Sequence, residues 1–305
     1  MTRRQREALD ELLRDGPLDI GGEVARQRAV FHEKIAAVPL PPDVSTTAGT
    51  LGAVPVVTVE TPGSDPSAVI LYFHGGAYAL GSAADSAALA ADVSRRVGAR
   101  AVSVDYRLAP EHPFPAALDD AVAAYRALLD DGVPSSRIAF VGESAGGGLV
   151  AATLVAVKDA GLAQPSSAVM FSPWADLTVS GASAVGKAAV DPALSAQGLR
   201  TRAGDYLGAT DPASPLASPI FADLTGLAPL LIRVGSHEIL LDDAVRLAAR
   251  AAEHDVAVEL QVWPQVPHVF QGFAALLDEA DAALHAAAAF TKSHWGPAVP
   301  EAEKA

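Results

Sequence analysis

The sequence contains no cysteine in its 305 residues. This absence excludes a disulfide framework, a thiolate zinc site and a cysteine nucleophile. Basic residues are also scarce, because 22 Lys and Arg stand against 36 Asp and Glu, for a net charge of −14. Nucleic acid and anionic membranes would repel such a surface, so neither is expected as the main partner. A small neutral or cationic molecule is compatible with this charge.

Long hydrophobic runs are absent as well. The longest apolar stretch, roughly residues 146–157, is shorter than the ~20 residues that cross a bilayer and is followed by Lys158 and Asp159. The first residues, MTRRQREALDELLRDG, are charged throughout and lack the apolar core of a secretory signal. We therefore expect no membrane span and a cytoplasmic location.

Apolar residues make up half of the chain, which is enough for a sizeable core. From about Val54 to Phe273, short β-branched runs alternate with longer Ala- and Leu-rich segments of helical spacing. This alternation predicts an α/β fold with a mostly parallel central sheet flanked by helices. The predicted strands are nearly continuous apolar runs, as expected for strands buried on both faces. They begin at Ala68, Ala99, Ile138, Ser167, Pro229 and Val256.

Two regions do not follow the alternation. Residues 1–50 contain two amphipathic helices and then the break PLPPD, whereas residues 176–225 form an irregular run rich in Ser, Gly and Pro. We expect no strand from either region and predict that both pack over one end of the sheet as a helical cap. An alternative for the first helices is a dimer arm. The predicted organisation is an N-terminal cap segment (1–50), a main domain in two parts (51–175 and 226–305) and a cap insertion (176–225).

One serine lies among small residues between a predicted strand and a predicted helix. The segment Gly142-Glu143-Ser144-Ala145-Gly146 matches the pattern G-x-S-x-G, in which a sharp turn lifts the serine clear of the backbone. The N–H of Ala145, at the start of the helix, can then face an oxyanion. Close packing of the helix is the alternative explanation of the small residues, but the position directly after the apolar run IAFV favours a nucleophile.

A second glycine motif, His74-Gly75-Gly76-Ala77-Tyr78, follows the first predicted buried strand. Consecutive glycines leave backbone N–H groups unhindered, so Gly75 and Gly76 are candidate donors of an oxyanion hole. An ordinary turn is the alternative. His74 is interpreted as an organiser of the loop rather than as a base.

A serine nucleophile needs a base, and the base needs a carboxylate. Of the eight histidines, His268 is the best placed, since it follows the last predicted strand. Glu238 is the first acid after the strand that begins at Pro229, and it is favoured as the carboxylate. Asp242 remains a rival, although acids at the start of a helix are expected for capping alone.

One further pattern is dismissed. The segment from Gly181 to Lys187 has the spacing of a phosphate-binding loop, but Ala188 replaces the hydroxyl residue that would hold magnesium and no strand precedes it.

Taken together, these motifs resemble the hormone-sensitive-lipase-like branch of the α/β-hydrolases, the bacterial carboxylesterases related to monoterpene lactone hydrolases and heroin esterase. The resemblance covers roughly Val54 to Phe273. It rests on HGGAY from His74, DYRLAPEHPFPAALDD from Asp105, GESAGGG from Gly142, SPWADL from Ser172 and GSHEILLDD from Gly235. It implies an α/β-hydrolase catalytic domain with a helical cap, and homodimers.

By resemblance, Ser144 is the nucleophile, His268 the base and then the acid, and Glu238 its orienting carboxylate. Gly75, Gly76 and Ala145 would form the oxyanion hole, while Tyr106, Arg107 and Glu111 would be structural. The sequence departs from the family at two positions, with Glu238 where most members have Asp and Ala77 where they have a third glycine.

The predicted function is a serine carboxylesterase that hydrolyses short- to medium-chain acyl esters or lactones through an acyl-enzyme, without a cofactor or metal. Two alternatives stay open. An amidase or peptidase would use the same three residues, and a non-catalytic ligand-binding protein could share the fold. The retained His268 argues against the second alternative.

Overall fold

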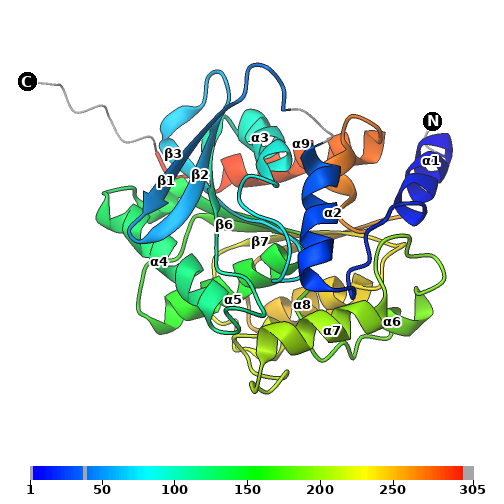
Figure 1. Ribbon diagram of the computed structural model, residues 1–305. Helices are drawn as coiled ribbons and strands as arrows, with labels where there is room; N and C mark the ends of the chain where they lie inside the picture. The colour runs from blue at the N-terminus through cyan, green and yellow to red at the C-terminus, as the bar shows by residue number, and fades with distance from the viewer. Residues whose placement is uncertain (1–2, 37–39, 298–305) are drawn as a thin grey trace, which may run out of the picture.

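A computed structural model describes residues 3–36 and 40–297, and its centre is an eight-stranded sheet (Figure 1). The first three strands in spatial order pair antiparallel, and all later neighbours pair parallel. The order is β1 (Ser45–Leu51), β2 (Val54–Glu60), β4 (Ala99–Val104), β3 (Asp65–Phe73), β5 (Ile138–Glu143), β6 (Ser167–Phe171), β7 (Leu230–Gly235) and β8 (Val258–Trp263). The six predicted strands correspond to β3–β8, which confirms the predicted mostly parallel α/β sheet.

The expectation that residues 1–50 supply no strand is wrong, because β1 comes from residues 45–51. The strand lacks apolar alternation, since all of its residues except Leu51 are exposed. It is held instead by backbone pairing with β2 along its whole length, from Ser45 opposite Glu60 to Leu51 opposite Val54. The sheet therefore begins inside the segment that was assigned to the cap.

Helices cover both faces of the sheet. One face packs against α3 (Ala87–Val97) and α9 (Asp278–Ser293), and the other against α4 (Ala116–Asp130), α5 (Ala145–Asp159) and α8 (Leu241–Glu253). Two short 3-10 turns complete this part of the chain. η1 (Ser135–Arg137) leads into β5, and η3 (Phe270–Phe273) follows the loop after β8. Because β5, β7 and β8 are parallel, their carboxyl ends meet at one edge.

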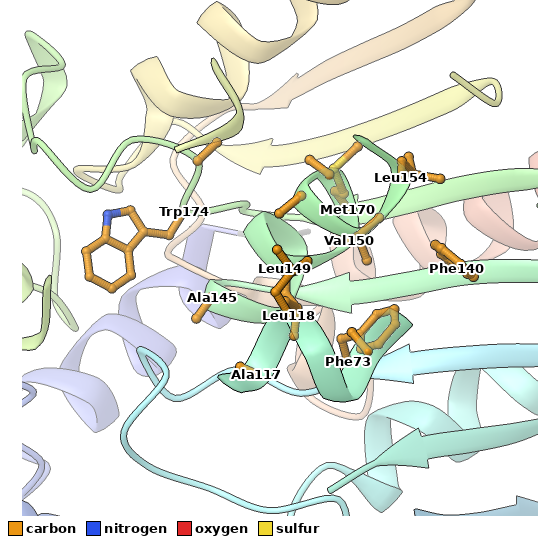
Figure 2. Close-up of a cluster of buried hydrophobic side chains, with 14 of the residues drawn as sticks. Phe73, Ala117, Leu118, Phe140, Ala145, Leu149, Val150, Leu154, Met170 and Trp174 are labelled. Atoms are coloured by element: carbon orange, nitrogen blue, oxygen red, sulfur yellow. The ribbon is translucent and has the colours of Figure 1, made fainter. Parts of the chain in front are cut away.

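The core between α5 and the sheet places the start of α5 tightly against a neighbouring strand (Figure 2). Phe140 on β5 makes edge-to-face contacts with Phe73, at 5.7 Å between ring centroids, and with Tyr125, at 4.8 Å. In the first turn of α5, a Cβ on Gly146 would lie 2.0 Å from the backbone oxygen of Phe73. Only glycine permits this approach, which brings the N-terminus of α5 beside the loop that follows β3.

The remaining helices belong to the two regions predicted to form a cap. They are α1 (Arg3–Arg14) and α2 (Val24–Ala36) from the first region, and α6 (Ser183–Gly186), α7 (Ala196–Leu207) and η2 (Pro219–Phe221) from the second. The second region is more regular than predicted, because Ser195 caps a three-turn helix by accepting the N–H of Gly198.

The two regions contact each other, and Figure 1 shows α2 next to α7. A Cβ on Gly21 would approach the Cα of Gly198 to 2.8 Å, and Arg202 donates to the backbone oxygen of Gly22. Across residues 3–36 and 40–297, none of the helices combines the length and apolar character needed to cross a bilayer.

Candidate active site

Ser144 lies at the turn between β5 and α5, where it is the N-cap residue with φ 56° and ψ −123°. The end of β6 and the loop after it fix this unusual backbone. Ser144 donates its N–H to the backbone oxygen of Phe171, and the backbone oxygen of Ser144 accepts the N–H of Trp174, both at 2.9 Å. The turn is so tight that a Cβ on Gly142 would lie 2.4 Å from the oxygen of Gly146. The strain projects the serine side chain from the carboxyl edge of the sheet.

The structure brings Ser144, His268 and Glu238 into one hydrogen-bonded chain. Nε2 of His268 lies 2.9 Å from Oγ of Ser144, and Nδ1 of His268 lies 2.7 Å from Oε2 of Glu238. The glutamate side chain is fully buried, and the imidazole is 9% exposed. An acceptor at Nδ1 fixes the tautomer that leaves Nε2 free to accept the serine proton.

The buried carboxylate of Glu238 has two further donors. Its Oε1 accepts the N–H of Gly235 at 2.6 Å and the hydroxyl of Ser172 at 2.8 Å. The same Ser172 oxygen accepts, at 3.1 Å, the N–H of Val269, the residue that directly follows His268. Ser172 thus bridges the acid and the histidine loop. Sequence reasoning assigned it no role, although Ser172 follows a predicted strand and begins the motif SPWADL.

The rival carboxylate, Asp242, points elsewhere. Its Oδ2 accepts the N–H of Ser183, and the Ser183 hydroxyl accepts the N–H of Asp242, so the pair joins α8 to α6. Asp242 thus joins α8 to the loop from Gly181 to Lys187, which was dismissed above as a phosphate site.

Among the described residues, no cluster of three or more His, Asp or Glu side chains is arranged to hold a metal ion.

The three predicted oxyanion donors, the N–H groups of Gly75, Gly76 and Ala145, differ in whether they already have a hydrogen-bond acceptor. The N–H of Gly75 donates to Oε1 of Glu143 at 2.9 Å, so it faces a carboxylate, and its expected part in the oxyanion hole is corrected. In residues 3–36 and 40–297, the N–H groups of Gly76, Ala77 and Ala145 have no acceptor. Sequence reasoning treated Ala77 only as a departure from a glycine, although its φ of 53° continues the turn begun by Gly76.

Glu143, the second residue of the serine motif, is hydrogen-bonded to this glycine loop through Gly75. Besides Gly75, its carboxylate accepts hydrogen bonds from the hydroxyls of Ser86, at 3.0 Å, and Tyr72. Burial raises the pKa of Glu143 and, more strongly, that of Tyr72. All three partners donate, so the carboxylate is satisfied without a cation.

His74 organises the loop as predicted from the residues. Its Nδ1 lies 2.7 Å from the oxygen of Gly75, and its ring stacks on Tyr106 at 4.1 Å between centroids. The Tyr106 hydroxyl donates to the backbone oxygen of His74. Burial lowers the pKa of His74, which favours the neutral ring.

The segment from Tyr106 to Glu111 connects the site to the first cap region. Arg107 pairs with Asp120 on α4, and Glu111 accepts two hydrogen bonds of 2.7 Å from Arg28 on α2. Arg28 also donates to the backbone oxygens of Ala79, at 2.8 Å, and Ala109, at 2.9 Å. One guanidinium therefore joins α2 to the loop that follows the glycine motif.

Comparisons with known proteins place this geometry in a family. A family model described as alpha/beta hydrolase fold matches residues 70–272. An acetyl-hydrolase of Streptomyces hygroscopicus is 42% identical over 90% of this chain and 92% of its own. An ethyl acetate hydrolase of Pseudomonas putida is 35% identical over 79% of each chain.

Solved structures agree with these matches. The crystal structure of an esterase from the bacterial hormone-sensitive lipase family covers 97% of this chain and 100% of its own, with a TM-score of 0.94 and 38% identity. The chain therefore belongs to the α/β-hydrolase fold family, next to bacterial esterases of the hormone-sensitive lipase family, and is a carboxylic ester hydrolase.

Proposed function

We propose that the protein hydrolyses carboxylic esters through an acyl-enzyme on Ser144. The observation that carries this proposal is the chain of hydrogen bonds from Ser144 through His268 to Glu238. Oγ of Ser144 attacks the ester carbonyl carbon while Nε2 of His268 takes its proton. Glu238 stabilises the imidazolium that forms.

The tetrahedral intermediate carries its negative charge on the former carbonyl oxygen. We assign its stabilisation to the N–H groups of Gly76, Ala77 and Ala145, which have no acceptor within the described residues. His268 then protonates the leaving alcohol as the carbon–oxygen bond breaks. Water attacks the acyl-enzyme with His268 again as base, the acid departs, and Ser144 regains its proton.

We propose short acyl groups as the preferred substrates. Tyr78 follows the glycine loop, and its ring stacks at 3.9 Å on Tyr206 of α7 and lies 6.0 Å from Trp174. The three aromatic rings are buried and occupy the space next to the loop, and Figure 2 shows Trp174 beyond the N-terminal end of α5. The names of the two curated relatives, an acetyl-hydrolase and an ethyl acetate hydrolase, support the same size class. A series of p-nitrophenyl esters of increasing acyl length tests it.

The nucleophile is tested by mass spectrometry of the intact protein after exposure to a fluorophosphonate, followed by peptide mapping. We expect a single adduct on Ser144, and none in Ser144→Ala, which should fold normally but lose ester hydrolysis. An unlabelled, well-folded wild-type protein would support the non-catalytic alternative. Comparing an ester and an anilide of the same acyl group separates an esterase from an amidase, since we expect turnover of the ester only.

We also propose that residues 1–44 and 176–225 act as the cap of this site. Their mutual contact at Gly21 and Gly198, the Tyr206–Tyr78 stack and the Arg28 hydrogen bonds support this role. Deletion of residues 1 to about 40 should change acyl-length preference more than the rate with the smallest ester. Unchanged acyl selectivity would contradict a cap.

We also propose that the protein forms homodimers and is located in the cytoplasm. β8 is an edge strand of the sheet, and its Leu260 and Val262 are exposed, which favours edge-to-edge pairing with a second copy. Light scattering of the wild type and of Val262→Lys tests the dimer, and cell fractionation tests the location.

A further inference from the structure

The insertion of residues 176–225 contains the same short turn twice. Asp191-Pro192-Ala193 and Asp211-Pro212-Ala213 have identical sequences. In both, Oδ1 of the aspartate accepts the N–H of the residue two positions later, at 2.8 Å for Ala193 and 2.9 Å for Ala213. This is the usual local bond of an aspartate that begins a turn. On local grounds the two aspartates are equivalent.

Their surroundings differ. Asp211 is exposed, whereas Asp191 is only 5% exposed. Oδ1 of Asp191 also accepts the N–H of Leu194 at 2.8 Å, and Oδ2 accepts the N–H of Ile239 at 2.8 Å. Ile239 directly follows Glu238 in the chain. One oxygen of Asp191 therefore completes its own turn, and the other reaches the peptide next to the proposed acid.

The peptide groups of Ile239 are bound to the insertion on both sides. Besides the bond from its N–H to Asp191, its backbone oxygen accepts the hydroxyl of Ser183 at 2.6 Å. The carboxylate of Glu238 is held separately, by Gly235 and Ser172 at the ends of the core strands. Residues at the ends of core strands thus hold the Glu238 carboxylate, whereas residues of the insertion hold the backbone that follows Glu238.

Resting on the proposed function, we propose that Asp191 is a positioning residue for Glu238. A glutamate has one more rotatable bond than the aspartate that most of the family has, so its carboxylate depends more on where its main chain is fixed. By holding the Ile239 N–H, Asp191 sets the main-chain position from which Oε2 of Glu238 reaches His268. Among the described residues, the Asp191 carboxylate accepts hydrogen bonds from backbone N–H groups alone, those of Ala193, Leu194 and Ile239.

The first test compares Asp191→Asn with the matched Asp211→Asn. Kinetics with p-nitrophenyl acetate are normalised to the fraction of protein that a fluorophosphonate labels at completion, so misfolded molecules are not counted. Asp191→Asn places an amide N–H₂ where one carboxylate oxygen accepted, so we expect kcat to fall about tenfold or more with KM within about twofold. Asp211→Asn should leave both constants unchanged. A normal kcat in Asp191→Asn overturns the proposal, even if thermal stability falls.

The second test asks whether Asp191 acts through Glu238. In a Glu238→Gln background, Asp191→Asn should lower kcat by less than about twofold, because the interaction it supports is already lost. Losses that multiply independently overturn the proposal. If the wild type neither hydrolyses p-nitrophenyl acetate nor reacts with the fluorophosphonate, the proposed function fails. If Glu238→Gln alone keeps wild-type activity, Glu238 is not the acid and the role of Asp191 falls with it. A defective Glu238→Gln beside a normal Asp191→Asn refutes only the role of Asp191.

Discussion

Gly75 donates its backbone N–H to the buried carboxylate of Glu143, so one residue of the serine turn holds the first glycine of the neighbouring loop. The two segments come from adjacent strands, β5 and β3, and this bond fixes their spacing. The next two N–H groups, of Gly76 and Ala77, have no acceptor within the described residues. We therefore expect Glu143 to influence the geometry of the proposed oxyanion hole through its bond to Gly75.

Replacement of Glu143 by glutamine should damage both stability and rate. Gly75, Ser86 and Tyr72 all donate to the carboxylate, so glutamine replaces one acceptor by an N–H₂ donor and forces a hydroxyl, of Ser86 or Tyr72, to accept instead. We expect a loss of about 1–3 kcal/mol in unfolding free energy and a lower kcat. Urea unfolding and ester kinetics measure the two effects. Glu60→Gln, at the exposed end of β2, is the control, and equal behaviour of the two variants would contradict this role.

The two candidate acids should differ widely when each is neutralised. Glu238→Gln removes the charge that stabilises the imidazolium of His268, so ester kcat should fall about 10²-fold or more. Asp242→Asn alters only the contact with Ser183 and should keep most of the activity. Steady-state kinetics at constant pH provide the comparison. The opposite ranking would assign the acid to Asp242.

Ser172→Ala should lower activity, because the Ser172 hydroxyl contacts both Glu238 and the backbone of the loop that carries His268. The substitution removes one donor to Glu238 and leaves the Val269 N–H without its acceptor. We expect about a tenfold fall in kcat and a loss of about 1–3 kcal/mol in unfolding free energy. Ser167→Ala is the matched control, since Ser167 begins β6, the strand that Ser172 directly follows, and its buried hydroxyl has no partner within the described residues. If both variants keep wild-type kcat, the bridge has no catalytic consequence.

The Arg28–Glu111 pair should make stability depend on pH in acid. Hydrogen bonds from Arg28, with a smaller contribution from a backbone N–H, lower the pKa of Glu111 from 4.5 to about 2. A carboxyl whose folded pKa is lowered stabilises the fold above its unfolded pKa and loses that contribution as pH falls from about 4.5 towards 2. The Glu111 side chain is 54% exposed, so solvent screening limits the effect to about 0.2–1 kcal/mol.

The measurement is the difference in unfolding free energy between the wild type and Glu111→Gln at several pH values. The difference should be present at neutral pH and shrink towards about pH 3, as well as in high salt. A difference that stays constant over this range would exclude the pair as its source.

Local sequence signals predicted the parallel part of the sheet well. β5 and β6 are buried along their whole length, so their apolar runs could be recognised without tertiary information. β1 could not be recognised, because its exposed residues carry no pattern and only its pairing with β2 makes it a strand. The helix α7 was hidden by its two glycines, Gly198 and Gly204, although Ser195 is a regular N-cap signal.

At the site, motif order predicted which side chains meet, but hydrogen bonds between distant segments determined the rest. Gly75 and Gly76 are equivalent in sequence, and only the carboxylate of Glu143, 68 positions away, distinguishes them. Asp191 lies 48 positions from Ile239, and its local turn is identical to that of Asp211. Such contacts depend on the folded arrangement, so composition and spacing do not reveal them.

The strand order has a consequence for engineering this enzyme. Reading the sheet from β5, the loop of Gly76 and Ala77 comes from the β3 side, whereas Ser172, Glu238 and His268 follow β6, β7 and β8 on the other side. The proposed anion binding and the proposed proton transfer would thus arise from opposite halves of one sheet, with Ser144 at their boundary. Libraries restricted to one half would vary one of these two contributions while leaving the other as an internal reference.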